Sequence, residues 1–285
     1  MSVAREWIKR HSIQSYIILA YGITWVMALP MILVYNHIIS VDVSFGLHYL
    51  LPYGPLLSAV IVSWAAGGVS NLRNILSRMS RWRVKWVWLV VAILSVWLLY
   101  AASGAIEVLT GAQWPGLELF GQVQFLPYLT FAGAWLLWVA TFGIGEETGW
   151  RGYLLPSLQS RYSALTSAMM VSVIWAGWHI PMFFYNENLI SLGAVGTVFW
   201  LIGLMFGSTL LTWLYNSSKG SILMTALWHG TFNLFTGATA QAASMTSGII
   251  TMFVMVWVVL IVVIYRPSDL SKSERQMQTG TRCVQ

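Results

Sequence analysis

The chain contains eight separate apolar runs, most of them about 20 residues long, which is the length at which an α-helix crosses the hydrocarbon core of a bilayer. These runs cover residues 13–35, 47–68, 86–109, 128–145 (continuing to about 158), 164–184, 192–215, 221–236 and 248–265. They are continuous, whereas the strands of a membrane barrel alternate between apolar and polar residues. We therefore expect an all-α, polytopic membrane helix bundle with about eight transmembrane helices.

The composition agrees with a membrane protein. Of the 285 residues, 58% are hydrophobic and only 8% are charged, whereas about 25% of the residues in a soluble domain are charged. The first run is too long for the core of a signal peptide, so we expect it to remain as a signal-anchor helix. The single cysteine, Cys283, excludes an internal disulfide and a multi-cysteine metal site. It is third from the end, so the tail is not a C-a-a-X prenylation motif.

Lys and Arg are distributed unevenly between the loops. The segment after the second run carries five cations and no acid, namely Arg73, Arg78, Arg81, Arg83 and Lys85. The positive-inside rule places this segment in the cytoplasm. Counting outward, the loops with acids but without Lys or Arg lie outside, and they contain Asp42, Glu107, Glu118 and Glu187. Both termini are then cytoplasmic, and the net charge of +6 reflects topology rather than nucleic-acid binding.

Three ionisable residues interrupt the fourth run, namely Glu146, Glu147 and Arg151. Charges at membrane depth are costly, and such residues usually have a function. Residues four apart share a helical face, so we expect Glu147 and Arg151 to form an ion pair. Glu146 points about 100° away from its neighbour. It therefore keeps no basic partner in its own helix, which suits a reactive carboxylate.

Two histidines and an asparagine lie on other apolar runs. His179 follows Trp175 by one turn, so the indole can pack against the imidazole. His229 and Asn233 share a helical face and can present two N–H donors to one point. A buried Glu146 suits a general base that activates water, together with His179. His229 and Asn233 suit the stabilisation of an oxyanion.

The same side chains also allow a metal site. Two histidines and one carboxylate can form an open catalytic zinc site, which here would consist of Glu146, His179 and His229. However, the chain has no H-E-x-x-H motif, and its histidines lie on different runs. We therefore prefer a site without a metal or other cofactor and keep zinc as the alternative. No G-x-S-x-G motif is present either, which argues against a serine nucleophile.

These polar residues fall into three ordered motifs: Glu146-Glu147-x-x-x-Arg151, Trp175-x-x-x-His179 and His229-x-x-x-Asn233. Together they resemble the type II CAAX prenyl endopeptidase family, which includes bacterial CAAX-protease-and-bacteriocin-processing (Abi-like) intramembrane proteases. The resemblance covers about residues 128–236. The second motif of the family usually begins with Phe, where this chain has Trp175. We expect function to survive this difference, because the position packs against the histidine.

The resemblance implies an intramembrane endopeptidase with eight helices and an active site reached from the cytoplasm. By motif position, Glu146 and His179 would activate water, while His229 and Asn233 would bind the oxyanion. The supporting residues would be Glu147, Arg151 and Trp175. The family has been discussed both as metal-dependent and as glutamate-dependent. Most bacterial members have no prenylated substrate, so the implied substrates are membrane-associated peptides or the tails of membrane proteins.

The sequence predicts three parts. Residues 1–120 form N-terminal helices of unassigned role, residues 121–265 form the peptidase-like part, and residues 266–285 form a polar, frayed cytoplasmic tail. Gly203 and Gly207 form a G-x-x-x-G motif, which permits a close helix contact. The size of the chain and its lack of sorting signals favour the plasma membrane of a bacterium, where it would contact membrane lipids. The sequence gives no indication of the oligomeric state.

Two other functions compete with proteolysis. The protein could be a non-catalytic immunity or scaffolding protein that retains the protease fold. It could also be a proton-coupled transporter that uses Glu146 and His179 as a relay. The absence of an internal sequence repeat argues against a transporter. A scaffold gains nothing from ionisable groups at membrane depth, so we favour an enzyme.

Overall fold

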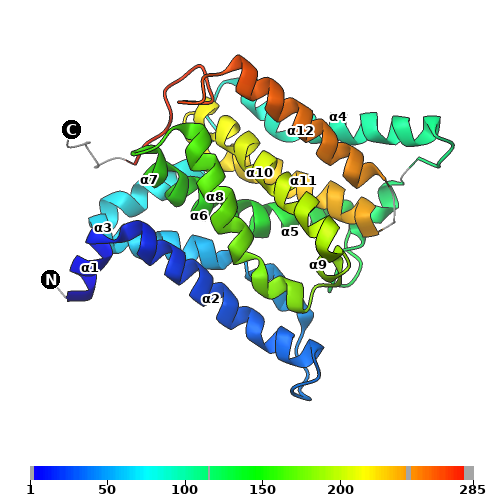
Figure 1. The fold of residues 1–285 in the computed structure, drawn as a ribbon, viewed down its shortest axis with the longest axis horizontal. Coiled ribbons are helices and arrows are strands. Elements are labelled where there is room, and N and C mark those ends of the chain that lie inside the picture. Colours follow the sequence, from blue (N-terminus) through cyan, green and yellow to red (C-terminus); the bar gives the residue numbers. More distant parts are fainter. Residues whose placement is uncertain (1–2, 115, 242–244, 279–285) are drawn as a thin grey trace.

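The computed structural model describes residues 3–114, 116–241 and 245–278, and these ranges are largely helical and contain no β-strand (Figure 1). Cys283 lies outside the described residues. The longer helices are α1 (Val3–Arg10), α2 (Ser12–Tyr35), α3 (Tyr53–Met79), α4 (Trp86–Leu109), α8 (Ala164–Trp178), α10 (Gly193–Ser217), α11 (Ile222–Gln241) and α12 (Thr246–Ile264). Short helical turns connect them, namely η1 (Phe45–Leu50), η2 (Leu117–Gly121), η5 (Ile180–Phe184) and α9 (Glu187–Ile190).

Six helical stretches in the described part of the chain are long and apolar enough to cross a membrane. They are Ser12–Tyr35, Phe45–Met79, Trp86–Leu109, Ala164–Phe184, Gly193–Ser217 and Thr246–Ile264. This confirms the expected class of a multi-pass, all-helical membrane protein. The other two apolar runs are also helical but are not among these six, so eight crossings with both termini in the cytoplasm remain a prediction.

Helix α3 corrects the predicted end of the second apolar run. The run was expected to end at residue 68 and to be followed by a basic loop. Instead, Gly68 adopts φ 64° and ψ −150° and kinks the helix, which then continues to Met79. Glycine tolerates this positive φ because it has no Cβ. Only residues 80–85 connect α3 to α4 without helical structure, so much of the predicted loop is helix.

The chain from Phe131 to Gln159 forms one continuous helical run of mixed type at the centre of the fold. It consists of α5 (Phe131–Trp138), η3 (Val139–Glu146), α6 (Glu147–Gly149), η4 (Trp150–Leu154) and α7 (Leu155–Gln159). Both η3 and η4 are π-helical, a wide helix type that is frequent at functional sites. Helices α3 and α11 both pack against this run. As a result, every residue from 145 to 159 is buried.

Two glycines allow α11 to approach η3 at backbone distance. A Cβ added to Gly143 would lie 2.5 Å from the carbonyl oxygen of Ala226, and one added to Gly230 would lie 2.7 Å from the Cα of Val139. Both distances are shorter than any carbon side chain tolerates, and the opposing atoms are backbone atoms that cannot rotate away. This contact therefore depends on glycine at both positions.

The G-x-x-x-G motif at Gly203 and Gly207 makes no comparable contact. A Cβ at Gly207 would meet nothing within 4 Å, and one at Gly203 would lie 3.6 Å from a methyl group of Thr251, which is an ordinary van der Waals distance. The motif permits a close helix contact, but α10 makes no contact at backbone distance through these two glycines. The spacing shows that small residues lie on one face of the helix, but tertiary packing decides whether another helix packs closely against that face.

The C-terminal segment is docked on the bundle, so the expectation of a frayed tail is wrong for residues 266–278. The backbone N–H groups of Ala164 and Leu165 donate to the carbonyl oxygens of Ser268 (2.8 Å) and Pro267 (3.0 Å). The first N–H groups of a helix have no partner within that helix. The tail therefore caps the start of α8.

A buried amide pair fixes the tail at a second place. The side chains of Gln159 and Asn216 are fully buried, and the Asn216 Nδ2 donates to the Gln159 Oε1 at 2.8 Å. The Asn216 Nδ2 also donates to the backbone oxygen of Asp269 (2.8 Å), and the Gln159 Nε2 donates to that of Gln276 (2.7 Å). Buried amides need such partners, so the tail completes the hydrogen bonding of α7 and α10.

The glycine contact between η3 and α11 predicts that Gly→Ala substitutions differ in their effect on the free energy of unfolding. Gly143→Ala and Gly230→Ala should each lower the free energy of unfolding by about 1–3 kcal/mol, because the added methyl group overpacks a backbone contact. Gly207→Ala is the matched control and should not destabilise the protein. Unfolding in detergent, followed by circular dichroism, measures all three. Equal destabilisation by Gly207→Ala and Gly143→Ala would contradict the prediction.

Candidate active site

Glu146 lies at the end of η3 with only 1% of its surface exposed. Its Oε2 accepts hydrogen bonds from two indole groups, the Nε1 of Trp150 at 3.1 Å and the Nε1 of Trp175 at 2.5 Å. Within the described ranges, no basic side chain pairs with this carboxylate and no hydrogen-bond donor reaches its Oε1. Two indoles therefore hold one oxygen and leave the other available to a reactant.

Glu147 forms the expected ion pair with Arg151. The Arg151 Nη1 lies 2.8 Å from the Glu147 Oε1, and both side chains are fully buried. The same oxygen also accepts a hydrogen bond from the Nδ1 of His229, at 2.9 Å. Sequence reasoning missed this second contact, because Glu147 and His229 are far apart in the chain and no local spacing connects them. Glu147 thus orients a candidate catalytic histidine in addition to neutralising a charge.

The ion pair is only partly satisfied by hydrogen bonds. Among the described residues, the Glu147 Oε2 and the Arg151 Nε and Nη2 are buried without a hydrogen-bond partner. The Arg151 Cζ instead lies 4.8 Å from the centroid of the Trp175 ring, a distance at which a cation–π attraction contributes. Buried polar atoms without partners lower the stability of the fold. A gain in stability therefore does not explain why these polar groups are buried here.

His229 and Asn233 lie together, as their spacing on one helical face predicts. The His229 Nε2 is 3.2 Å from the Asn233 Nδ2. In the neutral ring, the proton on Nδ1 is donated to Glu147, so Nε2 is an acceptor for the amide of Asn233. When the ring is protonated, Nε2 becomes a second donor beside that amide. The pair can therefore present two donors to one oxygen only in the protonated state.

His179 is the last, capping residue of α8 and is partly exposed. Its Nδ1 lies 2.8 Å from the backbone oxygen of Trp175. A carbonyl oxygen only accepts, so Nδ1 carries the proton and Nε2 carries the lone pair. The rings of Trp178 and Trp200 lie edge-on to the imidazole, with centroids 4.8 and 5.1 Å away. The ring contacts therefore fix the orientation of the imidazole, and the hydrogen bond to the Trp175 oxygen fixes its neutral tautomer.

Trp175 is the side chain around which these groups gather. It donates to Glu146, lies beneath Arg151, and meets the His229 ring edge-on at a centroid distance of 5.2 Å. Its centroid is also 6.0 Å from that of His179. The structure thus brings residues from three separate helical segments into one buried cluster. Sequence reasoning assigned Trp175 only to packing and missed its hydrogen bond to Glu146.

His48 is a further histidine near the cluster that no sequence motif indicated. It lies in η1 and is 6% exposed, and its Nδ1 is 2.7 Å from the hydroxyl oxygen of Tyr185. Its ring centroid is 5.5 Å from that of Phe142, one turn before Glu146. The available sequence signal was a lone histidine at the start of an apolar run, which more often indicates a structural residue.

The geometry gives no support to the zinc alternative. No three His, Cys, Asp or Glu side chains in the described ranges are grouped closely enough to hold a metal ion. The Glu146 Oε2 faces two indoles, and the Nδ1 of His229 is bound to Glu147. The zinc alternative with Glu146, His179 and His229 as ligands therefore stays a prediction that only a metal analysis can decide.

The buried ion pair predicts a non-additive response to mutation. Glu147→Gln should lower the free energy of unfolding by about 3–5 kcal/mol, because Arg151 stays charged and buried without a counter-charge. The double variant Glu147→Gln/Arg151→Met should lose less than the single variant, since it removes both charges. Unfolding in detergent measures both, with the exposed Glu187→Gln as control. A double variant that is as unstable as Glu147→Gln, or more so, would contradict this prediction.

Comparison with known proteins matches the part of the chain that contains this cluster. Residues 127–235 match the family model described as type II CAAX prenyl endopeptidase Rce1-like. CAAX prenyl protease 2 of Methanococcus maripaludis is 35% identical over 116 residues, which are 39% of this chain and 40% of that protein. The chain thus spans less than half of this curated relative. The matched segment includes all three motifs, so residues 127–235 of this chain are similar to the Rce1-like type II CAAX prenyl endopeptidases.

Proposed function

We propose that this protein is an intramembrane endopeptidase that hydrolyses a peptide bond in a membrane-associated peptide or protein. The observation that carries the proposal is the arrangement of Glu146, a buried carboxylate with one oxygen held by two indoles and the other oxygen unengaged in the described structure. The endopeptidase family model covers this segment. The name of the archaeal relative, a prenyl protease, agrees with the same reaction class.

Glu146 acts as the general base in this proposal. Its Oε1 takes a proton from a water molecule as the water oxygen attacks the carbonyl carbon of the peptide bond. The lone pair on the Nε2 of His179 accepts the second hydrogen bond of that water and orients it. The protonated Glu146 then transfers its proton to the amine that leaves. The carboxylate returns to its starting state without a covalent enzyme intermediate.

His229 and Asn233 stabilise the negative charge that develops on the carbonyl oxygen. The Glu147 carboxylate accepts a hydrogen bond from the Nδ1 of His229 and holds the ring beside the Asn233 amide; with a proton on Nε2, the ring donates alongside that amide. A single donor to such an oxyanion contributes on the order of 10²–10³ in rate. Glu147 and Arg151 therefore act as positioning residues. They fix the ring of His229 but do not contact the substrate.

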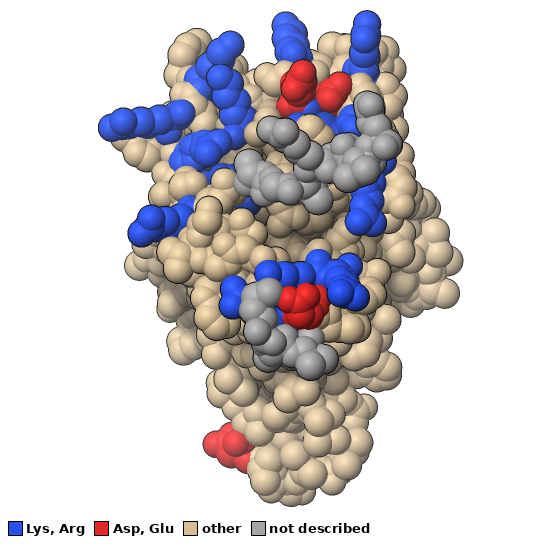
Figure 2. All heavy atoms as spheres, turned by 90° about the vertical axis from the view of Figure 1, so that its left-hand side faces the viewer, with Lys and Arg blue, Asp and Glu red and all other residues tan. Residues whose placement is uncertain are grey.

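The substrate and setting follow from the membrane-spanning fold. A site within a bundle of apolar helices favours a peptide that is itself associated with the bilayer, such as the tail of a membrane protein. Lys and Arg gather at the end of the molecule where α1 and the C-terminal segment lie (Figure 2). By the positive-inside rule this end is cytoplasmic. We place the protein in a bacterial plasma membrane with its site reached from the cytoplasm.

The role of Glu146 is tested by Glu146→Gln, which keeps the shape of the side chain but cannot accept a proton. We expect kcat for cleavage of a membrane-borne reporter peptide to fall by at least about a hundredfold, as for loss of a general base. The exposed Glu187→Gln should retain full activity, and both variants should unfold at the wild-type temperature. Undiminished cleavage by a folded Glu146→Gln protein would refute the proposed role.

A strong chelator separates this mechanism from the zinc alternative in the same assay. Activity should be unchanged after chelation, because the proposal involves only protein groups and water. Loss of activity that added Zn²⁺ restores would instead establish metal dependence. A protein without cleavage activity in any form would favour the non-catalytic immunity or scaffolding alternative.

The indole of Trp175 predicts a partial loss of activity. Trp175→Phe keeps an aromatic ring beneath Arg151 but removes the N–H donor to Glu146, and Trp150 remains as the second donor. One hydrogen bond to a charged group is worth about 1.5–3 kcal/mol, so kcat should fall by roughly tenfold to a hundredfold with little change in KM. Trp213→Phe, at a buried tryptophan without this contact, is the control. Equal activity of Trp175→Phe and wild type would contradict the role of the indole.

A further inference from the structure

A cavity of about 810 Å³ lies where three distant segments of the chain meet. The segments are the α3–α4 connection, the α10–α11 turn and the C-terminal segment. Its lining includes five cations, Arg81, Arg83, Lys85, Lys219 and Lys272, and no Asp or Glu. We refer to it as the basic cavity. Five of the 15 Lys and Arg residues of the chain thus surround a single cavity.

Hydrogen bonds hold two of these segments together. The Arg81 Nη1 donates to the backbone oxygen of Lys219 at 2.5 Å, and the Ser221 hydroxyl donates to the backbone oxygen of Arg81 at 2.6 Å. The α10–α11 turn is tight, with φ 56° at Lys219 and φ 78° at Gly220. These bonds keep the α3–α4 connection, with Arg81, Arg83 and Lys85, beside the turn that carries Lys219.

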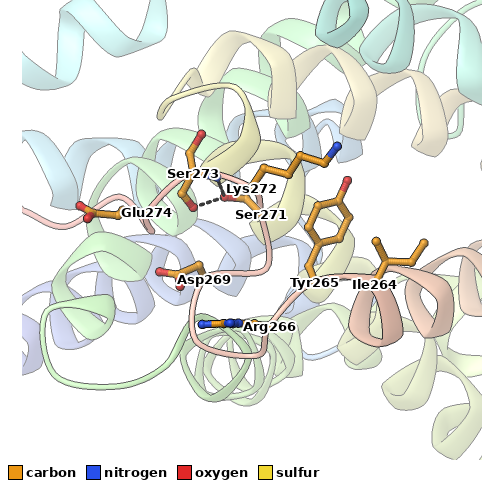
Figure 3. Close-up of a pocket in the computed structure, with 8 residues that line it drawn as sticks. All are labelled: Ile264, Tyr265, Arg266, Asp269, Ser271, Lys272, Ser273 and Glu274. Atoms are coloured by element: carbon orange, nitrogen blue, oxygen red, sulfur yellow. Dashed lines mark hydrogen bonds between the residues drawn. The ribbon is translucent and has the colours of Figure 1, made fainter.

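The acids nearest to the basic cavity do not neutralise it. Asp269 and Glu274 line a neighbouring pocket of about 370 Å³, which shares Tyr265, Lys272 and Ser273 with the basic cavity. Figure 3 shows Lys272 extending past Tyr265 and away from both acids. In the described part of the chain, none of the five cations forms an ion pair with a carboxylate. Clustered like charges repel, so an anion from outside the chain would stabilise this arrangement.

The start of α4 adds a further electropositive group. Its N-cap residue, Lys85, provides no side-chain hydrogen bond to the first turn. Lys85, Val87 and Trp88, all at this helix start, line the basic cavity. The N-terminus of a helix carries a partial positive charge and free N–H groups, which together favour phosphate and other anions. The helix start and the basic side chains therefore favour the same kind of ligand.

Apolar surface adjoins the cations and indicates where such an anion comes from. Val84, Val87, Trp88 and Tyr265 also line the basic cavity. Beside it, Trp82 is 60% exposed and Trp86 is 74% exposed, as in the aromatic belt at a membrane surface. A soluble anion would require only the charges. Charges that continue into apolar walls fit a head group with attached acyl chains.

We propose that the basic cavity binds the phosphate group of an anionic phospholipid from the cytoplasmic leaflet. Lys and Arg around the phosphate would supply the attraction, and the apolar walls together with the lipid-facing start of α4 would contact the acyl chains. Clusters of basic residues on the cytoplasmic side of membrane helices are suited to such head groups. This proposal concerns a separate site and does not depend on peptidase activity.

Lipid titration of the purified full-length protein, followed by native mass spectrometry, tests the proposal. The cavity variant is Arg83→Gln/Lys85→Gln/Lys272→Gln, because these three side chains are exposed and make no structural hydrogen bond in the described chain. The control is Arg10→Gln/Arg73→Gln/Arg161→Gln, which removes the same charge from exposed positions elsewhere. The probes are phosphatidylglycerol, phosphatidylcholine and inorganic phosphate. Thermal unfolding verifies that each variant is folded.

Wild type should bind phosphatidylglycerol more tightly than phosphatidylcholine. The cavity variant should lose about tenfold to a hundredfold in affinity for phosphatidylglycerol, given the attraction of each cation to an anionic surface, while the control keeps its affinity. If the triple variant fails to fold, the single variant Lys272→Gln, on the exposed tail, replaces it. This variant should show a smaller loss of affinity for phosphatidylglycerol. Equal losses in the cavity variant and the control would overturn the proposal, as would equal binding of both lipids. Displacement of phosphatidylglycerol by inorganic phosphate at similar concentration would show a soluble anion site instead.

Discussion

The buried ion pair of Glu147 and Arg151 is the interaction on which the rest of the cluster depends. Two charges that are fully removed from solvent are tolerated only when they are paired, and here each one also contacts a further helix. Glu147 accepts from His229 on α11, and Arg151 lies over Trp175 on α8. The need to neutralise one arginine thereby sets the relative positions of the central helical run, α8 and α11. The candidate catalytic side chains lie at their junction.

Sequence reasoning succeeded where the interaction is local and stopped where it depends on packing. The pairs Glu147–Arg151 and His229–Asn233 were predictable, because residues four apart on a helix meet whatever surrounds them. The apolar runs likewise predicted the helical class. The contact of Glu147 with His229, the two indoles on Glu146 and the position of His48 join distant parts of the chain. No local spacing encodes them, and π-helical turns shift side chains away from the directions that a regular α-helix predicts.

Trp175 illustrates how a departure from a familiar motif can add a contact. The family that the motifs resemble usually has Phe at this position, and a Phe ring can pack against histidine but cannot donate a hydrogen bond. The indole does both, and its N–H reaches the carboxylate of Glu146 beside that of Trp150. In this chain the aromatic surroundings therefore contribute directly to holding the carboxylate, and the cluster is more tightly connected than its motif spacing alone implies.

The cap that the C-terminal segment provides to α8 has a consequence for the biosynthesis of the protein. The backbone oxygens that accept from Ala164 and Leu165 belong to Ser268 and Pro267, which the ribosome adds only after α10, α11 and α12. Until then, two N–H groups in the first turn of the helix that carries Trp175 and His179, those of Ala164 and Leu165, lack these partners. Chains are synthesised from the N-terminus, so the helix of the second motif is completed late. A growing chain that has not yet reached residue 268 therefore lacks this cap on the helix that carries the second motif.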